Sequence, residues 1–370
     1  MNVSRGQRIA LQAGASVAVI AGASWLMVDV PRLTGSTWHD VQRNLAQIDL
    51  ETTFAIAGLW IAGLIFYTIA MTASMPGLSH RRALALNLSG SSVANVLPFG
   101  GVVGTGLNVA MVRSWRLSLR SFASSTAVLN LVNLLTKLVL PVVAGLVVLH
   151  QSGLPKWLGR AAVGGSIAAA LVVLAVVAAL VSNGWARRVD ALLRRISQMR
   201  PGRRGTPVGT APGPVAAIHG EVRDIFRQSW GRLTVGLAGY VLLQWALFAL
   251  CMHSAGISGR PGAVFAAFAV ERALTLAVVT PAGTGVAEVG ATALLVAMGF
   301  PAGPAAAGVL LYRLFVYLAE IPVGALVVAG WATLRLRTGR LTARSLGDAA
   351  GDVSAIPMAS TSSPPAASRM

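Results

Sequence analysis

Residues 262–300 read GAVFAAFAVERALTLAVVTPAGTGVAEVGATALLVAMGF. The stretch is apolar, but it carries Glu271, Arg272 and Glu288 and is interrupted by Pro-Ala-Gly-Thr-Gly at residues 281–285. An ionised group near the centre of a bilayer costs roughly 2.5–3.5 kcal/mol, so such groups usually face a protein interior or a cavity. Irregular backbone at that depth is tolerated only inside protein or along a cavity. The stretch therefore predicts a broken membrane helix beside a polar interior.

A similar break occurs in the first half of the chain. Residues 83–112 are apolar and contain PFGGVVG at residues 98–104. The basic residues on both sides of this segment predict that it enters and leaves the membrane on one side. Each arm is shorter than the roughly 20 residues that cross a bilayer as a helix. We therefore expect two hairpins that re-enter the membrane or are built from short helices.

Composition sets the class of the fold. The chain is 55% hydrophobic and only 11% charged, with a mean hydropathy of +0.69. Several apolar runs are long enough to span a bilayer. We expect an all-α, polytopic membrane protein with about six full spans, two broken hairpins, and so eight or more hydrophobic segments. The expected full spans cover residues 9–28, 53–75, 121–149, 161–181, 233–253 and 304–334.

Charge predicts orientation more than it predicts partners. The net charge is +18, and most of the Lys and Arg residues lie in segments assigned to one side. This is the positive-inside pattern, so nucleic acid is not an expected partner. It predicts a multi-pass protein of the cytoplasmic membrane with both termini inside. Residues 183–232 are expected to be a basic, partly disordered cytoplasmic loop, and residues 335–370 a disordered tail.

The two halves show signs of an inverted repeat, with repeat one near residues 53–182 and repeat two near residues 233–334. Aligning Pro98 with Pro281 also aligns Gly100 with Gly283 and Lys137 with Glu320. Inverted repeats with broken helices at their interface recur in transporters, where the binding site lies near the middle of the membrane. The whole of residues 1–334 is thus expected to form one membrane domain.

Polar residues recur on single helical faces. Asn130, Asn133 and Lys137 share one face of the third span, and Arg313 and Glu320 share one face of the last. Asn87, Ser91 and Asn95 do the same in the first hairpin. We predict that these faces meet in one site. The predicted pathway residues are Glu271, Arg272, Glu288, Arg313, Glu320, Lys137, Asn130 and Asn133. The predicted helix breaks are Pro98, Gly100, Gly101, Gly104, Pro281, Gly283 and Gly285.

A second interpretation of the same residues is structural. Three acids and three bases suit ion pairs between helices, such as Lys137 with Glu320, or Arg313 with Glu271 or Glu288. The asparagines also suit hydrogen bonds between helices. Both interpretations remain open at the level of the sequence.

No cofactor or metal is expected. The five histidines lack metal-ligand spacing, and Cys251 is the single cysteine. Residues 100–106 lack the Gly-Lys-Ser/Thr ending of a phosphate-binding loop. No Ser/His/Asp set suggests hydrolysis.

The motifs taken together resemble a known family. The glycine-rich hairpins, Glu271-Arg272 before the second one, Gly283-Thr-Gly285 leading to Glu288, and Tyr312-Arg313 occur in the order found in the flippase-like transmembrane domain of the lysylphosphatidylglycerol synthase family. The resemblance covers about residues 8–335. It implies a domain that handles or translocates lipid, with Glu271, Arg272, Glu288 and Arg313 along the substrate pathway.

No loop of this chain is long enough for a folded transferase, so we expect no enzymatic activity. The leading hypothesis is a translocase for a polar-headgroup lipid. The alternatives are a secondary transporter of a small solute and a membrane anchor for a cell-envelope enzyme. The expected partners are membrane lipids, with an anionic or aminoacylated phospholipid favoured, and self-association into a homo-oligomer stays open.

Overall fold

The computed structural model describes residues 29–97, 100–149, 156–181, 214–276 and 283–335, and those residues are helical wherever they have regular structure. The all-α polytopic fold is confirmed. The chain divides into two compact units, residues 1–325 and 326–370. All elements discussed below lie in the first unit, except that the last helix runs on to residue 335.

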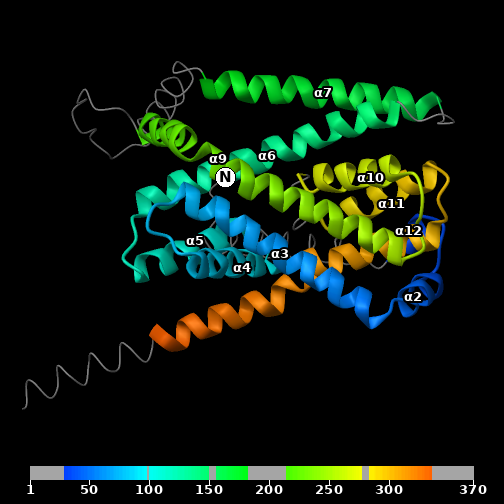
Figure 1. The fold of residues 1–370 in the computed structure, drawn as a ribbon, viewed down its shortest axis with the longest axis horizontal. Coiled ribbons are helices and arrows are strands. Elements are labelled where there is room, and N and C mark those ends of the chain that lie inside the picture. Colours follow the sequence, from blue (N-terminus) through cyan, green and yellow to red (C-terminus); the bar gives the residue numbers. More distant parts are fainter. Residues whose placement is uncertain (1–28, 98–99, 150–155, 182–213, 277–282, 336–370) are drawn as a thin grey trace, which may run out of the picture. The chain divides into compact units, whose positions relative to one another are not determined.

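Helices account for nearly all of the described chain (Figure 1). In chain order the elements are α2 (Trp38–Ala46), α3 (Leu50–Ser74), α4 (His80–Val96), α5 (Gly100–Ser114), α6 (Leu119–Leu149), α7 (Lys156–Val181), α9 (Pro214–Ser254), α10 (Pro261–Leu274), α11 (Val286–Ala297), α12 (Ala302–Arg313) and the π-helix η2 (Leu314–Leu318). A final helical stretch covers residues 320–335.

Four described helices are long and apolar enough to cross a membrane: Leu50–Ser74, Leu119–Val147, Gly220–Ser254 and Ala302–Arg335. They correspond to four of the expected full spans. In α7, whose side chains are described only as far as residue 175, the apolar helix Gly159–Ala175 falls just below that length. The expected first span, residues 9–28, lies outside the described residues.

Both expected hairpins are present as pairs of short helices. The arms α4 and α5, and α10 and α11, have 17, 15, 14 and 12 residues, and the two helices of each pair pack against one another. At ~1.5 Å per residue, none of the four arms reaches across a hydrocarbon core of about 30 Å. Each hairpin therefore depends on neighbouring helices to enclose its broken tip.

Each hairpin packs against the helix that follows the other hairpin. Helices α3 and α9 lie side by side and run in opposite directions (Figure 1). Helix α10 of the second hairpin packs against α6, which follows the first hairpin. Helix α4 of the first hairpin meets the helix that follows the second, at Tyr317 and Gly324. The inverted repeat itself stays a prediction, and this reciprocal packing is the arrangement it would produce.

The tightest packing surrounds the second hairpin. Phe248, Phe268 and Tyr312 are fully buried. Their rings make edge-on or tilted contacts, with centroids 5.1–6.4 Å apart. Alanines at 0% exposure in α10, α11 and α12 let these helices approach closely. This core positions Glu271, Glu288 and Arg313, which are considered below.

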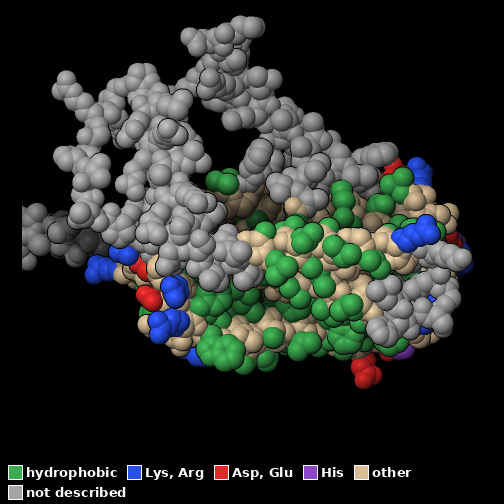
Figure 2. Space-filling view, turned by 90° about the horizontal axis from the view of Figure 1, so that it is seen from above, with side chains coloured by type: hydrophobic (Ala, Val, Ile, Leu, Met, Phe, Trp, Pro, Cys, Tyr) green, Lys and Arg blue, Asp and Glu red, His purple; other side chains and the backbone are tan. Residues whose placement is uncertain are grey.

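One boundary differs from the sequence-based expectation. Residues 214–232, expected to belong to the basic cytoplasmic loop, form the first turns of the continuous helix α9. No proline interrupts the chain between residues 215 and 254, so nothing ends the helix where charged residues give way to apolar ones. Figure 2 shows the corresponding charge pattern, with hydrophobic side chains across one face and charged side chains gathered toward its two ends.

Candidate functional site

A buried ion cluster joins the second hairpin to α12. Arg313 donates from Nε to Glu288 Oε1 at 2.7 Å and from a terminal nitrogen to Glu271 Oε1 at 3.2 Å. Glu271 and Glu288 are 0% exposed and Arg313 is 3% exposed. Removing one partner of such a buried pair costs about 3–5 kcal/mol, because an uncompensated charge remains. The cluster therefore holds α10, α11 and α12 in one arrangement.

Glu288 also stabilises the break in the hairpin. Its second oxygen, Oε2, accepts a hydrogen bond from the backbone N–H of Gly285 at 2.7 Å. Gly283 and Gly285 adopt φ values of +71° and +86°, which side chains other than glycine rarely accept. The predicted breaks at these two glycines are thus turns in the left-handed region, and the Glu288 carboxylate caps the helix that follows them.

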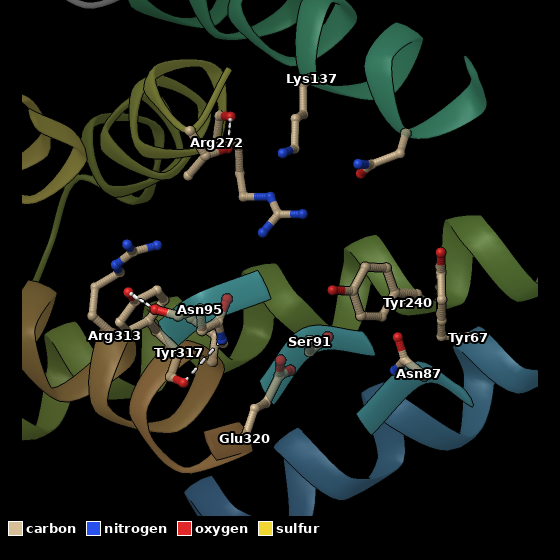
Figure 3. Close-up of a pocket in the computed structure, with 13 residues that line it drawn as sticks. Tyr67, Asn87, Ser91, Asn95, Lys137, Tyr240, Arg272, Arg313, Tyr317 and Glu320 are labelled. Atoms are coloured by element: carbon tan, nitrogen blue, oxygen red, sulfur yellow. Dashed lines mark hydrogen bonds between the residues drawn. The ribbon is translucent and has the colours of Figure 1, made fainter. Parts of the chain in front are cut away.

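A polar cavity of about 250 Å³ opens beside this cluster. Its wall carries three basic side chains, Lys137, Arg272 and Arg313, and one acidic side chain, Glu320. Figure 3 shows Lys137 and Arg272 reaching into the cavity from one side and Glu320, beside Ser91, on the other. The remaining lining residues are Tyr67, Asn87, Ser91, Asn95, Asn133, Tyr240, Thr275, Val316 and Tyr317.

The side chains that face the cavity carry a net positive charge. Glu271 and Glu288 pair with Arg313 and do not line the cavity, so this cluster of three carries one net negative charge behind the cavity wall. Within the described residues, Lys137, Arg272 and Glu320 form no salt bridge within 4.0 Å. This leaves two cations and one carboxylate facing the cavity. Such a wall suits an anionic group, or a larger molecule that carries an anionic and a cationic group.

A second cavity of about 430 Å³ adjoins the first at the first hairpin. The two cavities share Tyr67, Asn87, Ser91, Asn133 and Lys137. The second is also lined by Asn130 and by the backbone of Gly90, Gly101 and Gly104. The polar path therefore runs from the second hairpin, past the shared residues, to the glycine-rich first hairpin.

Asn95 and Tyr317 close the cavity where the first hairpin meets η2. Asn95 Nδ2 donates to the Tyr317 carbonyl at 3.1 Å, and the Tyr317 hydroxyl donates to the Asn95 carbonyl at 2.6 Å. The Arg313 guanidinium lies 5.0 Å from the Tyr317 ring centroid. Short π-helical segments of this kind occur frequently at functional sites.

A comparison of the sequence with models of protein families agrees with this architecture. The family model described as the lysylphosphatidylglycerol synthase TM region matches residues 14–324. The chain belongs to this family. A search of curated proteins found no match. Membership in the lysylphosphatidylglycerol synthase TM family identifies a membrane protein connected with lipid-related processes.

In this family member most of the predicted pathway residues come together. Lys137, Asn133, Arg272, Arg313 and Glu320 line the first cavity, and Asn130 lines the second. Glu271 and Glu288 lie behind Arg313 instead. Gly100 begins α5 close to Ala94 and Val93 at the tip of the hairpin, while Gly101 and Gly104 lie inside α5, so these two glycines do not break a helix as predicted. Pro98 and Pro281 lie outside the described residues.

The structure also separates the two interpretations of the charged residues. Arg313 forms the expected pairs with Glu271 and Glu288. The other expected pair, Lys137 with Glu320, is not among the ion pairs of the described residues. Both of these side chains face the cavity. Arg313 thus belongs both to a buried cluster with Glu271 and Glu288 and to the cavity wall, while Lys137, Arg272 and Glu320 only line the cavity.

Sequence reasoning singled out Tyr312 beside Arg313 but missed Tyr67 and Tyr240. Tyr67 and Tyr240 line the first cavity, with ring centroids 5.1 Å apart. Tyr312 donates to Gln244 Oε1 at 2.7 Å, and Tyr317 contacts Asn95. These are the four tyrosines of the chain, and each lies within an apolar segment. Tyrosines usually gather at the membrane surface, so their positions inside these segments were the available signal.

No group of three or more His, Cys, Asp or Glu side chains suited to a metal occurs in the part of the chain that the structure describes.

Proposed function

We propose that this protein moves a polar-headgroup lipid across the membrane without changing it chemically. The headgroup passes through the polar cavities while the acyl chains stay in the bilayer. The observation that carries the proposal is the wall of the first cavity, where Lys137 and Arg272 face Glu320 between two broken hairpins. A solvent-like polar path inside apolar helices lowers the cost of taking a charged headgroup through the hydrocarbon region.

The distribution of charge favours a phospholipid as the cargo. Lys137 and Arg272 suit the phosphate, and Glu320 on the opposite side suits an amine. An aminoacylated phosphatidylglycerol carries both groups, and phosphatidylglycerol carries the first. The family's connection with lysylphosphatidylglycerol supports the same class of cargo. Amide and hydroxyl groups of Asn87, Asn133 and Tyr240 supply neutral hydrogen bonds to the rest of a headgroup.

The test is translocation in proteoliposomes. Fluorescent phosphatidylglycerol, an aminoacylated analogue and phosphatidylcholine are reconstituted separately, and dithionite measures how much of each becomes exposed outside. The wild type is compared with Arg272→Gln and Glu320→Gln. Arg113→Gln is the control, because Arg113 is exposed and lies outside both cavities.

The expected result is protein-dependent movement of phosphatidylglycerol and of its aminoacylated analogue, and Arg272→Gln should reduce both because both carry the phosphate. Glu320→Gln should reduce movement of the aminoacylated lipid more than that of phosphatidylglycerol. The control should move both lipids at the wild-type rate. Movement of no lipid by folded wild-type protein, under imposed proton and sodium gradients, would refute the proposal.

A further inference from the structure

An apolar groove of about 570 Å³ lies between α6 and α9, apart from the polar cavities. Val132 and Thr136 line it from α6, and Phe226, Trp230, Leu237 and Val241 are among the residues that line it from α9. The hydroxyl of Thr136 is bonded to the Val132 carbonyl at 2.8 Å, so it presents its methyl group to a ligand without leaving a donor unpaired. The groove is therefore suited to a hydrocarbon chain.

The same two helices separate this groove from the central cavity. On α6, Asn133 and Lys137 line the cavity, while their neighbours Val132 and Thr136 line the groove. On α9, Tyr240 lines the cavity and Val241 lines the groove. A molecule in the groove is thus distinct from one in the proposed translocation path.

The part of the groove between Trp230 and Val241 has about the length of one leaflet, and Phe226 extends the groove one turn further toward the charged end of α9. From Trp230 to Val241 the helix rises ~17 Å, and one leaflet is about half of a hydrocarbon core of roughly 30 Å. Charged residues recur along α9 up to Arg232, and the helix is then uncharged as far as His253. Trp230 therefore lies at headgroup depth, where tryptophan is enriched, and Val241 lies among the acyl chains.

Two cations stand at the headgroup end of the groove. Arg227 and Arg223 lie about one and two turns before Trp230, respectively, and both are exposed. Neither forms a salt bridge with any described residue. Glu221, the nearby acid that faces α6, is engaged by Arg120 and by the Ser124 hydroxyl. Asp224 is the other acid of this turn and is exposed, so the two arginines leave a positive excess.

We propose that the groove between α6 and α9 binds one anionic phospholipid, with an acyl chain against Trp230 to Val241 and its phosphate at Arg223 and Arg227. The apolar wall takes the chain, and the arginines select the charge of the headgroup. This lipid is a bound component of the fold and is not the transported molecule. The site does not depend on the proposed function.

The experiment counts bound lipids by native mass spectrometry. Delipidated full-length protein is titrated in mixed micelles with dioleoyl phosphatidylglycerol or dioleoyl phosphatidylcholine. The wild type should bind one phosphatidylglycerol in preference to phosphatidylcholine. Arg223→Gln/Arg227→Gln should weaken phosphatidylglycerol binding about thirtyfold and leave phosphatidylcholine unchanged, since each arginine near a charged headgroup contributes roughly a factor of five.

Filling the groove tests the acyl-chain part of the site. Ala238→Trp, or Leu242→Trp if the first variant does not fold, should remove the bound lipid whatever its headgroup. Val235→Trp is the matched control, because Val235 is exposed on the same helix but outside the groove. Arg81→Gln/Arg113→Gln is the control for the loss of two surface charges.

Two outcomes would overturn the proposal. A bound lipid that depends on Arg272 and survives the arginine pair and the tryptophan variants belongs to the central cavity. Groove variants that dissociate a dimer while every lipid adduct persists would make this face a contact between two copies. Retention of the adduct in Arg272→Gln, together with its loss in the groove variants, is the expected result.

Discussion

Asn95 and Tyr317 lie 222 positions apart in the chain and are joined by two hydrogen bonds that run in opposite directions. The Asn95 side chain donates to the Tyr317 backbone, and the Tyr317 side chain donates to the Asn95 backbone. Asn95 ends the first arm of the first hairpin, and Tyr317 lies within the π-helical turn after the second hairpin. These two hydrogen bonds therefore join one hairpin to the helix that follows the other, at the wall of the cavity.

Replacing Tyr317 with phenylalanine should weaken the contact between Asn95 and Tyr317. The part-buried Asn95 carbonyl loses its donor, and a typical hydrogen bond contributes about 0.5–1.5 kcal/mol. Hydrogen exchange should rise at residues 93–97. Tyr312→Phe is the matched control, because it also removes one hydroxyl hydrogen bond, to Gln244, away from the hairpin tip. Unchanged hydrogen exchange at residues 93–97 in Tyr317→Phe would show that the Tyr317 hydroxyl does not stabilise the end of α4.

The ion cluster should be strongly destabilised when its cation is removed. Arg313→Gln leaves Glu271 and Glu288 buried without a full positive charge beside them, and we expect a loss of about 3–5 kcal/mol in unfolding free energy. Denaturant titration in detergent measures it. The double variant Arg313→Gln/Glu271→Gln should recover part of the loss, and Arg113→Gln should change stability by less than about 0.5 kcal/mol. No recovery in the double variant would argue against charge as the cause.

Replacing the carboxylate with an amide should destabilise the protein by different amounts at Glu271 and Glu288. Both oxygens of Glu288 are engaged, by Arg313 and by the Gly285 N–H. Glu271 Oε2 has no hydrogen-bond partner among the described residues. A glutamine at position 288 must turn its NH₂ toward one of two donors, whereas at position 271 it can direct the NH₂ away from Arg313. Glu288→Gln should therefore lower the melting temperature more than Glu271→Gln, and the reverse order would contradict this geometry.

The first hairpin should tolerate a methyl group at one glycine and not at another. A Cβ at Gly104 would lie 2.7 Å from the Gly90 carbonyl oxygen of the opposing arm, while nothing lies within 4 Å of a Cβ at Gly101. Gly104→Ala should cost about 1–3 kcal/mol by overpacking. Gly101→Ala should be neutral or slightly stabilising, because alanine is the better helix former. Equal effects of both substitutions on the unfolding midpoint would mean that the arms separate readily.

The cap of α3 should contribute a small dependence on pH. Asp49 accepts a hydrogen bond from the Thr52 side chain and another from the Thr52 N–H at 2.9 Å. These bonds, the side-chain bond first, hold the pKa of the Asp49 carboxyl below its ordinary value of 3.8. A carboxyl with a lowered folded-state pKa stabilises the fold above its unfolded-state pKa, and that stability is lost as pH falls through the folded value. Asp49→Asn keeps a capping oxygen but does not titrate.

The measurement is the unfolding midpoint of the wild type and of Asp49→Asn across the acid range. The difference between them should shrink as pH falls below 3.8. Glu51→Gln removes an exposed carboxyl two residues away and serves as the charge control. If the unfolding midpoints of wild type and Asp49→Asn differ by the same amount at every pH, the titration of Asp49 does not contribute to the acid dependence of stability.

Much of the fold could be predicted from length and chemistry alone. A run such as residues 53–75 has few arrangements other than a membrane helix, because unpaired backbone is too costly in hydrocarbon. The breaks near Gly100 and Gly283 could be located for the same reason, since glycine and proline interrupt an otherwise apolar helix. Charged residues inside these segments predicted a polar interior, and Lys137, Arg272 and Glu320 do line one.

The sequence did not predict how the helices are rotated and which charges meet. In water, polar and apolar faces reveal the rotation of a helix, but in a bilayer the lipid-facing side is as apolar as the packed side. Tyr67, Tyr240 and the groove along α9 could not be assigned to a face for this reason. Arg313 could pair with either of two acids on sequence grounds and pairs with both. Only tertiary packing decides this, because α10 and α11 bring Glu271 and Glu288 to one guanidinium and leave Lys137, Arg272 and Glu320 to the cavity.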